Sequence, residues 1–285
     1  SWIYFRRYQM TRPPIGVFNL SDIAVLLIGV ILIPYLYLYL PRWLIGGLLC
    51  LGAASILYFL FEPVLRIYWI RWLVTLLILC TELGTAWHAS AHRHSFLLVN
   101  NMVQVLTVVG VTVLWAQSGM KARDATMLGL ALALYDFIFT TQLPLMADLF
   151  AHLAEPPFAP LIAWPVGSRG LWLGIGVGDL LLAAVFPLVM RRAFGPTAGW
   201  IALGIGLGTI TVLFVLANLR VWSAIFPVMG VLGPLMGLQY AFWRRRWGPE
   251  RTTRQYWQAE PLPTPTTTAI PSLFEYLPFS HEDIR

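Results

Sequence analysis

Long runs of apolar residues, broken by short polar stretches, make up most of this chain. A helical run of about 20 apolar residues is long enough to cross the apolar core of a bilayer. The pattern therefore predicts eight transmembrane helices, at residues 20–40, 43–62, 67–88, 96–117, 125–147, 171–190, 197–219 and 222–243. Charged residues and prolines separate most of these runs, as at Glu62-Pro63 and at Gly195-Pro196.

Composition supports this interpretation. The 285-residue chain is 58% hydrophobic and only 11% charged, and its mean hydropathy is +0.71. A soluble domain of this length does not hide so much apolar surface behind so few charges. We therefore expect an all-α polytopic membrane protein of about eight transmembrane helices, with residues 1–247 as the transmembrane domain and the lipid bilayer as its surroundings.

Basic residues predict the orientation of these helices. The net charge of +6 comes from arginines that gather at the ends of the apolar runs, which indicates membrane topology and no nucleic-acid partner. A cytoplasmic N-terminus places twelve basic residues on the cytoplasmic side and four on the other. The positive-inside rule therefore predicts that both termini are cytoplasmic.

The last segment of the chain, residues 248–285, differs from the rest. It is rich in proline and threonine and has no long apolar run, a composition typical of disordered tails. We expect it to be cytoplasmic, and to become ordered only by lying against the protein's own helices or against a partner subunit.

Two aspartates lie inside the predicted spans. Asp136 follows Asp124 by 12 residues, and Asp179 precedes Arg191 by 12 residues, so both lie roughly 18 Å from the same membrane face. An acid at that depth is costly and usually marks a functional cavity. Two adjacent carboxylates share one proton, which suits an aspartic-protease dyad. A structural carboxylate and a proton or ion relay remain open as alternatives.

Glycines and prolines accompany these acids. Gly174, Gly176 and Gly178 precede Asp179 and allow close helix approach or local unwinding. Prolines early in the last predicted span, at Pro227 and Pro234, would interrupt that helix and free backbone groups for pairing with an unfolded substrate.

Three short motifs resemble those of the presenilin and signal peptide peptidase family of GxGD intramembrane aspartyl proteases. They are Tyr135-Asp136, Gly176-Val177-Gly178-Asp179 and Pro227-Val228-Met229, in the family's order. The last departs from the family's Pro-Ala-Leu, because valine and methionine replace alanine and leucine. The segment Ala159-Pro160-Leu161-Ile162-Ala163-Trp164-Pro165 is similar to a segment that precedes GxGD in archaeal homologues.

The resemblance covers residues 125–243, the part expected to be similar to the catalytic core, in a presenilin-like bundle. It implies hydrolysis of membrane-spanning peptides without a cofactor. The implied catalytic residues are Asp136 and Asp179. The residues implied to support the active site are Tyr135, Gly176, Gly178, Pro227, Val228 and Met229. The segment implied to pair with the substrate consists of Pro160, Leu161, Ile162, Ala163, Trp164 and Pro165. The family has nine spans where the pattern here predicts eight, and the predicted orientation is similar to that of signal peptide peptidase.

A histidine cluster supports an alternative. His88 and His92 are four residues apart, with His94 nearby, and are weak candidates for binding a metal, haem or a chlorophyll-type pigment. On that reading the chain is a non-catalytic, protease-like subunit of a larger membrane complex. A proton-coupled transporter that uses the two aspartates as a relay is a third possibility. Glu82, inside the third span, has no role in the protease hypothesis; Arg93 or a histidine is a candidate partner.

Overall fold

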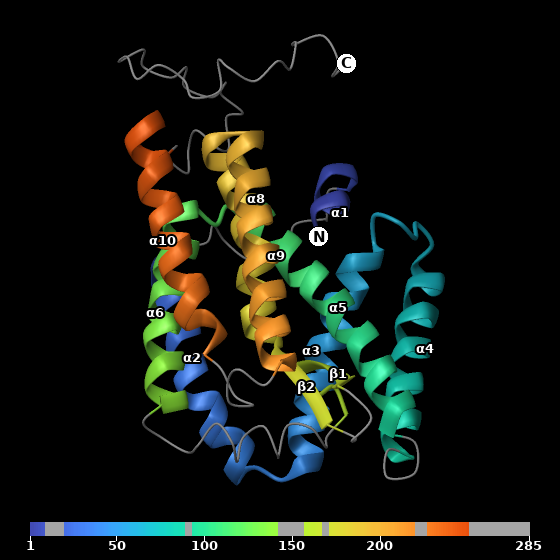
Figure 1. Ribbon diagram of the computed structural model, residues 1–285. Helices are drawn as coiled ribbons and strands as arrows, with labels where there is room; N and C mark the ends of the chain where they lie inside the picture. The colour runs from blue at the N-terminus through green and yellow to red at the C-terminus, as the bar shows by residue number, and fades with distance from the viewer. Residues whose placement is uncertain (9–19, 89–92, 142–156, 167–170, 220–226, 251–285) are drawn as a thin grey trace.

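The computed structural model describes residues 1–8, 20–88, 93–141, 157–166, 171–219 and 227–250. Within these residues each of the eight predicted ranges contains a long helix (Figure 1). The helices are α1 (Trp2–Arg7), α2 (Leu20–Tyr39), α3 (Arg42–Phe61), α4 (Tyr68–Trp87), α5 (Arg93–Gln117), α6 (Ala122–Thr141), α8 (Val177–Phe194), α9 (Pro196–Asn218) and α10 (Val228–Trp247). The predictions made for the tail fall almost entirely outside the described residues.

Five of these helices are long and apolar enough to cross a membrane, namely α2, α3, α4, α5 and α9. The other three long helices, α6, α8 and α10, carry more charged residues, among them Asp136, Asp179 and the arginines at the ends of α8 and α10. The chain is thus a mostly helical protein with several helices able to span a bilayer.

A β-hairpin replaces part of one predicted helix. Strand β1 (Leu161–Val166) pairs antiparallel with strand β2 (Leu171–Gly176), so the helix expected over residues 171–190 begins only at Val177. The all-α expectation is corrected by this one hairpin. Glycines at 174 and 176 disfavour a helix, and an apolar run by itself does not distinguish a strand from a helix.

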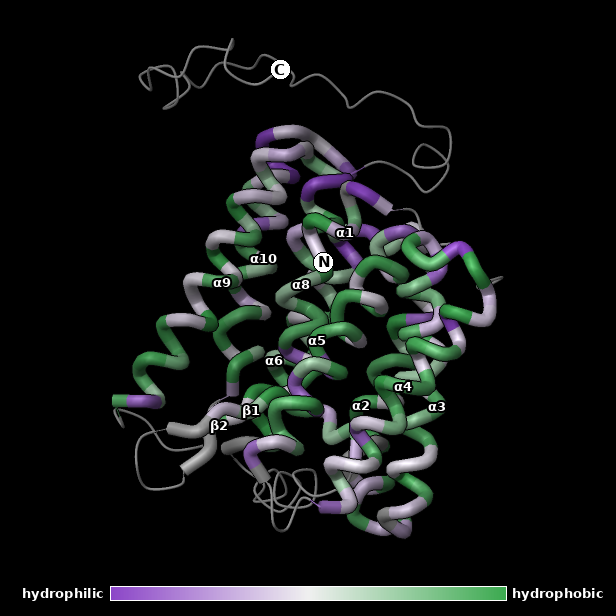
Figure 2. Tube along the Cα trace, turned by 90° about the vertical axis from the view of Figure 1, so that its right-hand side faces the viewer, coloured by the Kyte–Doolittle hydropathy of each residue, from purple (hydrophilic) through white to green (hydrophobic). Residues whose placement is uncertain are grey.

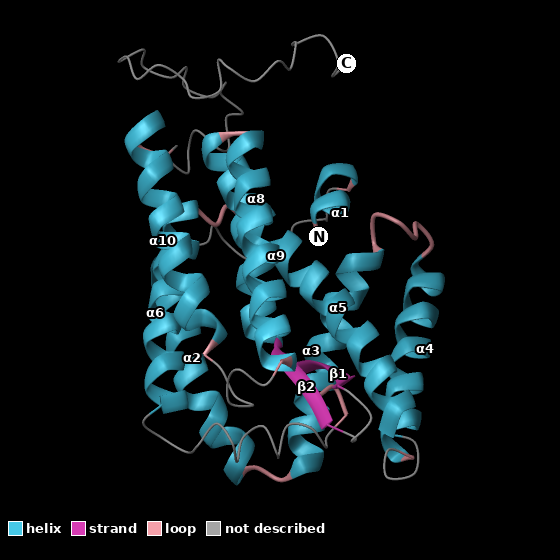
Figure 3. Ribbon diagram, in the orientation of Figure 1, coloured by secondary structure: helices cyan, strands magenta, loops and turns pink. Residues whose placement is uncertain are grey.

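The hairpin lies at the end of the molecule opposite α1 (Figure 3). Hydrophobic residues run along most of the helices, whereas hydrophilic residues gather towards the end that carries α1 (Figure 2). The main buried core joins α8 to its neighbours α5, α6, α9 and α10. Leu182, Val185 and Met190 of α8 and Met229 of α10 are almost completely buried in it.

Candidate active site

Asp136 contacts the beginning of α10. It lies near the C-terminal end of α6, and its Oδ2 accepts a hydrogen bond of 3.1 Å from the backbone N–H of Met229. Met229 is the second residue of α10, and the first N–H groups of a helix have no partner within that helix. The side chain of Asp136 therefore caps a helix that begins more than ninety residues later.

Asp179 lies in the first turn of α8. Leu180, which follows Asp179, and Val228, which precedes Met229, line the same cavity, so the first turns of α8 and α10 lie near each other. Asp136 is bonded to the first turn of α10 and Asp179 belongs to the first turn of α8, so both acids lie at this end of the bundle.

Small residues allow α6 and α10 to approach closely. A Cβ added at Gly233 would lie 2.7 Å from the Cβ of Ala133 and 3.0 Å from the carbonyl carbon of Gly129. Ordinary carbon–carbon contacts are about 3.5–4.0 Å, so no larger residue fits there without a shift. This packing lies one helical turn from Met229 and fixes the distance between α10 and Asp136.

The glycines beside Asp179 leave room next to its carboxylate. A Cβ at Gly176 would lie 3.5 Å from Asp179 Oδ2, and one at Gly178 would meet no atom within 4 Å. Gly176 is the last residue of β2 and directly precedes α8. The absence of side chains at Gly176 and Gly178 thus leaves space beside the first turn of α8, which carries Asp179.

Tyr135 makes an aromatic contact and no hydrogen bond through its hydroxyl within the described residues. Its ring stacks on that of Phe139 with 4.2 Å between the centroids, and its buried hydroxyl has no hydrogen-bond partner among the described residues. Pro227 is the N-cap residue of α10, and Pro234 lies within that helix without ending it. The expected interruption of the last span is therefore at Pro227 only, within the described residues.

Leu161 to Pro165 of the predicted substrate-pairing segment lie in β1, the inner strand of the hairpin, and Pro160 directly precedes that strand. Ala163 of β1 faces Gly174 of β2, while its own N–H and C=O bond to the side chain of Asn101 on α5. In an antiparallel pair, two residues directly opposite each other either hydrogen-bond to each other through their N–H and C=O groups or both point these groups away from the partner strand. Gly174 therefore presents its N–H and C=O at the outer edge of β2, where the described residues provide no further strand.

An apolar cavity of about 320 Å³ lies along β2. It is bounded by β2, by α9 and by the first residues of α8 and α10. Its lining residues are Trp164, Leu173, Gly174, Ile175, Leu180, Ile210, Thr211, Leu213, Phe214, Ala217 and Val228. The cavity has no charged lining residue, and it adjoins the turn of α8 that carries Asp179.

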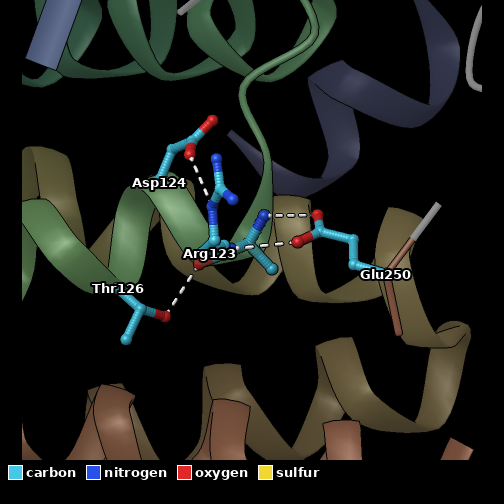
Figure 4. A network of polar contacts seen from close by, with 5 residues as sticks. Arg123, Asp124, Thr126 and Glu250 are labelled. Carbon is cyan, nitrogen blue, oxygen red and sulfur yellow. Dashed lines mark hydrogen bonds and ion pairs between the residues drawn. The ribbon is translucent and has the colours of Figure 1, made fainter. Parts of the chain in front are cut away.

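The other end of the α6–α10 pair carries a second carboxylate cap. Glu250, just beyond α10, accepts hydrogen bonds from the backbone N–H groups of Ala122, at 2.6 Å, and Arg123, at 3.1 Å (Figure 4). Arg123 also pairs with Asp124 at 3.3 Å. The N-terminus of α10 is therefore capped by Asp136, from the C-terminal end of α6, and the N-terminus of α6 by Glu250, just beyond the C-terminal end of α10. The sequence analysis missed the cap by Glu250.

The remaining predicted residues lie away from this site. His88 is exposed at the end of α4, where it lines an open pocket with Gly84, Thr85 and Ser95, and His92 lies outside the described residues. No group of three metal-ligating side chains occurs among the described residues. Glu82 is fully buried, and its Oε1 accepts a hydrogen bond of 3.2 Å from the backbone N–H of Phe158.

Comparison of the chain with protein-family models, curated proteins and solved structures gave no match.

Proposed function

We propose that this protein is an intramembrane aspartyl endopeptidase with Asp136 and Asp179 as its catalytic dyad. The observation that carries the proposal is the hydrogen bond from Met229 N–H to Asp136, at the start of a helix whose Val228 lines the same cavity as Leu180, the neighbour of Asp179. The three motifs are far apart in the sequence but lie at the same end of the bundle. Burial of their apolar neighbours alone would not bring them to one end.

The reaction is hydrolysis of a peptide bond by water. The ionised carboxylate of the dyad removes a proton from water, whose oxygen adds to the scissile carbonyl carbon, while the protonated carboxylate polarises the carbonyl oxygen. The C–N bond of the resulting tetrahedral intermediate then breaks, and the leaving amine takes the proton that the first carboxylate removed from water. Gly176 supports this role because it leaves space beside Asp179 for the substrate backbone.

The substrate is a membrane-spanning peptide that unwinds near the dyad. Its extended segment pairs with the outer edge of β2, at the backbone groups of Gly174, and its side chains enter the apolar cavity beside Leu173 and Ile175. β2 continues directly into α8, so a peptide paired with it passes close to Asp179. The lining of the cavity favours apolar side chains.

All eight long helices cross the bilayer in this proposal, and both termini are cytoplasmic. The three helices with the most charged residues gather in the bundle, where α6 and α10 pack on each other and α8 packs on both. Polar residues in membrane helices are tolerated when they face the interior of a bundle. A reporter fused to the C-terminus and found on the outer side would contradict this orientation.

Cleavage of a transmembrane reporter peptide in proteoliposomes tests the proposal. Asp136→Asn and Asp179→Asn keep the size of each side chain, and we expect each to lower the rate by about 10²–10⁴-fold, since each removes an acid–base group. Asp124→Asn, on the same helix as Asp136 but outside the site, is the matched control and should retain activity. A wild-type protein that is folded and cleaves nothing would favour the non-catalytic subunit instead.

A further inference from the structure

Helix α5 forms strand-like hydrogen bonds with β1. The side-chain Nδ2 of Asn101 donates to the C=O of Ala163 at 2.8 Å, and its Oδ1 accepts from the N–H of Ala163 at 2.9 Å. One side chain thus satisfies both backbone groups of a residue 62 positions away, as a neighbouring strand would.

Two further amides of α5 extend this contact along the chain. Asn100 donates to the C=O of Leu161 at 2.9 Å and to that of Ala159 at 3.1 Å. Gln104, one turn further along α5, donates to the C=O of Phe158 at 3.0 Å. We call Asn100, Asn101 and Gln104 the amide row.

Packing does not explain the amide row. Asn100 is completely buried and Gln104 is 5% exposed, on a helix otherwise apolar enough to cross a membrane. Buried amides are costly in such a place unless they are paired, and an open strand edge is equally costly in lipid. The amide row and the edge of β1 each satisfy the other, so α5 closes this edge of the hairpin.

We propose that Asn101 is a positioning residue for proteolysis, an inference that rests on the proposed function. By holding β1 against α5 it leaves the outer edge of β2 as the edge open to a substrate, and it fixes the tilt of the hairpin over the dyad. Neighbouring peptide bonds of an extended substrate are only about 3.3 Å apart. A hairpin released from Asn101 therefore presents adjacent bonds to Asp136 and Asp179, and cleavage spreads over several positions.

The test compares two substitutions on α5 that remove polar atoms at nearly constant volume. Asn101→Leu removes both bonds to Ala163. Thr107→Val removes a hydroxyl that bonds only within α5, to the C=O of Val103 at 2.9 Å, and is the matched control. The readouts are the masses of all products from one transmembrane peptide, and the hydrogen exchange of residues 158–166 measured without substrate.

We expect Asn101→Leu to raise the ratio of neighbouring products to the main product by up to about tenfold, since it removes two hydrogen bonds and each contributes about threefold in a membrane protein. It should also speed exchange in residues 158–166, and Thr107→Val should change neither. An unchanged product ratio in Asn101→Leu overturns the proposal, even if the total rate falls. Asn101→Asp, which keeps the Oδ1 acceptor for the N–H of Ala163, gives an intermediate ratio and serves if the leucine variant does not fold.

The two readouts separate the inference from the proposed function. If the wild-type protein cleaves no peptide, the protease proposal fails and the positioning role fails with it. The exchange comparison then still decides whether Asn101 holds β1.

Discussion

The close packing of α6 on α10 gives the sharpest prediction, for Gly233→Ala. The added Cβ would lie 2.7 Å from the Cβ of Ala133, whereas an ordinary carbon–carbon contact is about 3.7 Å. The two helices must therefore separate locally by about 1 Å. Overpacking of this kind costs about 1–3 kcal/mol, and the better helix propensity of alanine offsets up to about 1 kcal/mol of it.

The effect on activity should exceed the effect on stability. Met229 lies one turn before Gly233, so the same separation would lengthen its 3.1 Å hydrogen bond to Asp136 to about 4 Å, beyond hydrogen-bonding range. A misplacement of about 1 Å at a catalytic group can cost about 10²-fold in rate. We expect Gly233→Ala to fold and to lose about that factor in cleavage.

Gly237→Ala is the matched control, because it lies one turn further along the same face of α10. A Cβ there would meet only the flexible end of Leu130, at 3.4 Å, so the helices need not separate. Both variants are compared by thermal unfolding in detergent micelles and by cleavage of the reporter peptide in proteoliposomes. Equal activity in the two alanine variants would refute the argument that this contact sets the geometry of Asp136.

Three further predictions concern separate parts of the molecule. Gly176→Ala places a methyl group 3.5 Å from Asp179 Oδ2, so we expect an unchanged melting temperature but cleavage slower by about tenfold; slow cleavage with a lowered melting temperature would indicate a folding defect instead. Glu250→Ala removes the cap of α6 and should lower the free energy of unfolding in denaturant by about 1 kcal/mol. Glu250→Gln keeps one acceptor and should lose about half of that, and no loss in either variant would contradict the cap. Burial raises the pKa of Tyr4, in α1, to about 12 from its ordinary 10.0, so the folded protein keeps a proton that the unfolded chain loses. This stabilisation is complete below about pH 10 and is lost as the pH rises through about 12, and Tyr4→Phe should flatten that part of the stability curve against pH.

The apolar pattern alone predicted where the long helices lie. A helix satisfies its own backbone groups, so its position depends on a local property, the length of an apolar run. Within the described residues the predicted ranges match the helices to within a few residues, except that α8 and α10 each begin six residues later than predicted, at Val177 and Val228. The place of Asp136 near the end of α6 and of Asp179 near the start of α8 was predictable for a related reason, because distance along a helix follows from residue count.

A strand forms its backbone hydrogen bonds with another segment, and the sequence of the strand does not show which segment that is. Residues 171–176 are apolar and glycine-rich, and they became a strand because β1 lies beside them and because α5 covers the other edge of β1. The roles of Asn101 and Glu250 had the same origin. A lone amide or carboxylate gives no sign in the sequence of the distant backbone it will bond, since only folding brings the two together.

The sequence by itself thus determined where the long helices of the described residues lie and the position of each aspartate along its helix, both of which follow from local periodicity and length. The tertiary structure decided that Asp136 caps α10 at the N–H of Met229, that Gly233 fixes the spacing of α6 and α10, and that the open edge of the hairpin belongs to β2. These features depend on contacts between residues far apart in the chain, and their energies exist only after the helices have packed.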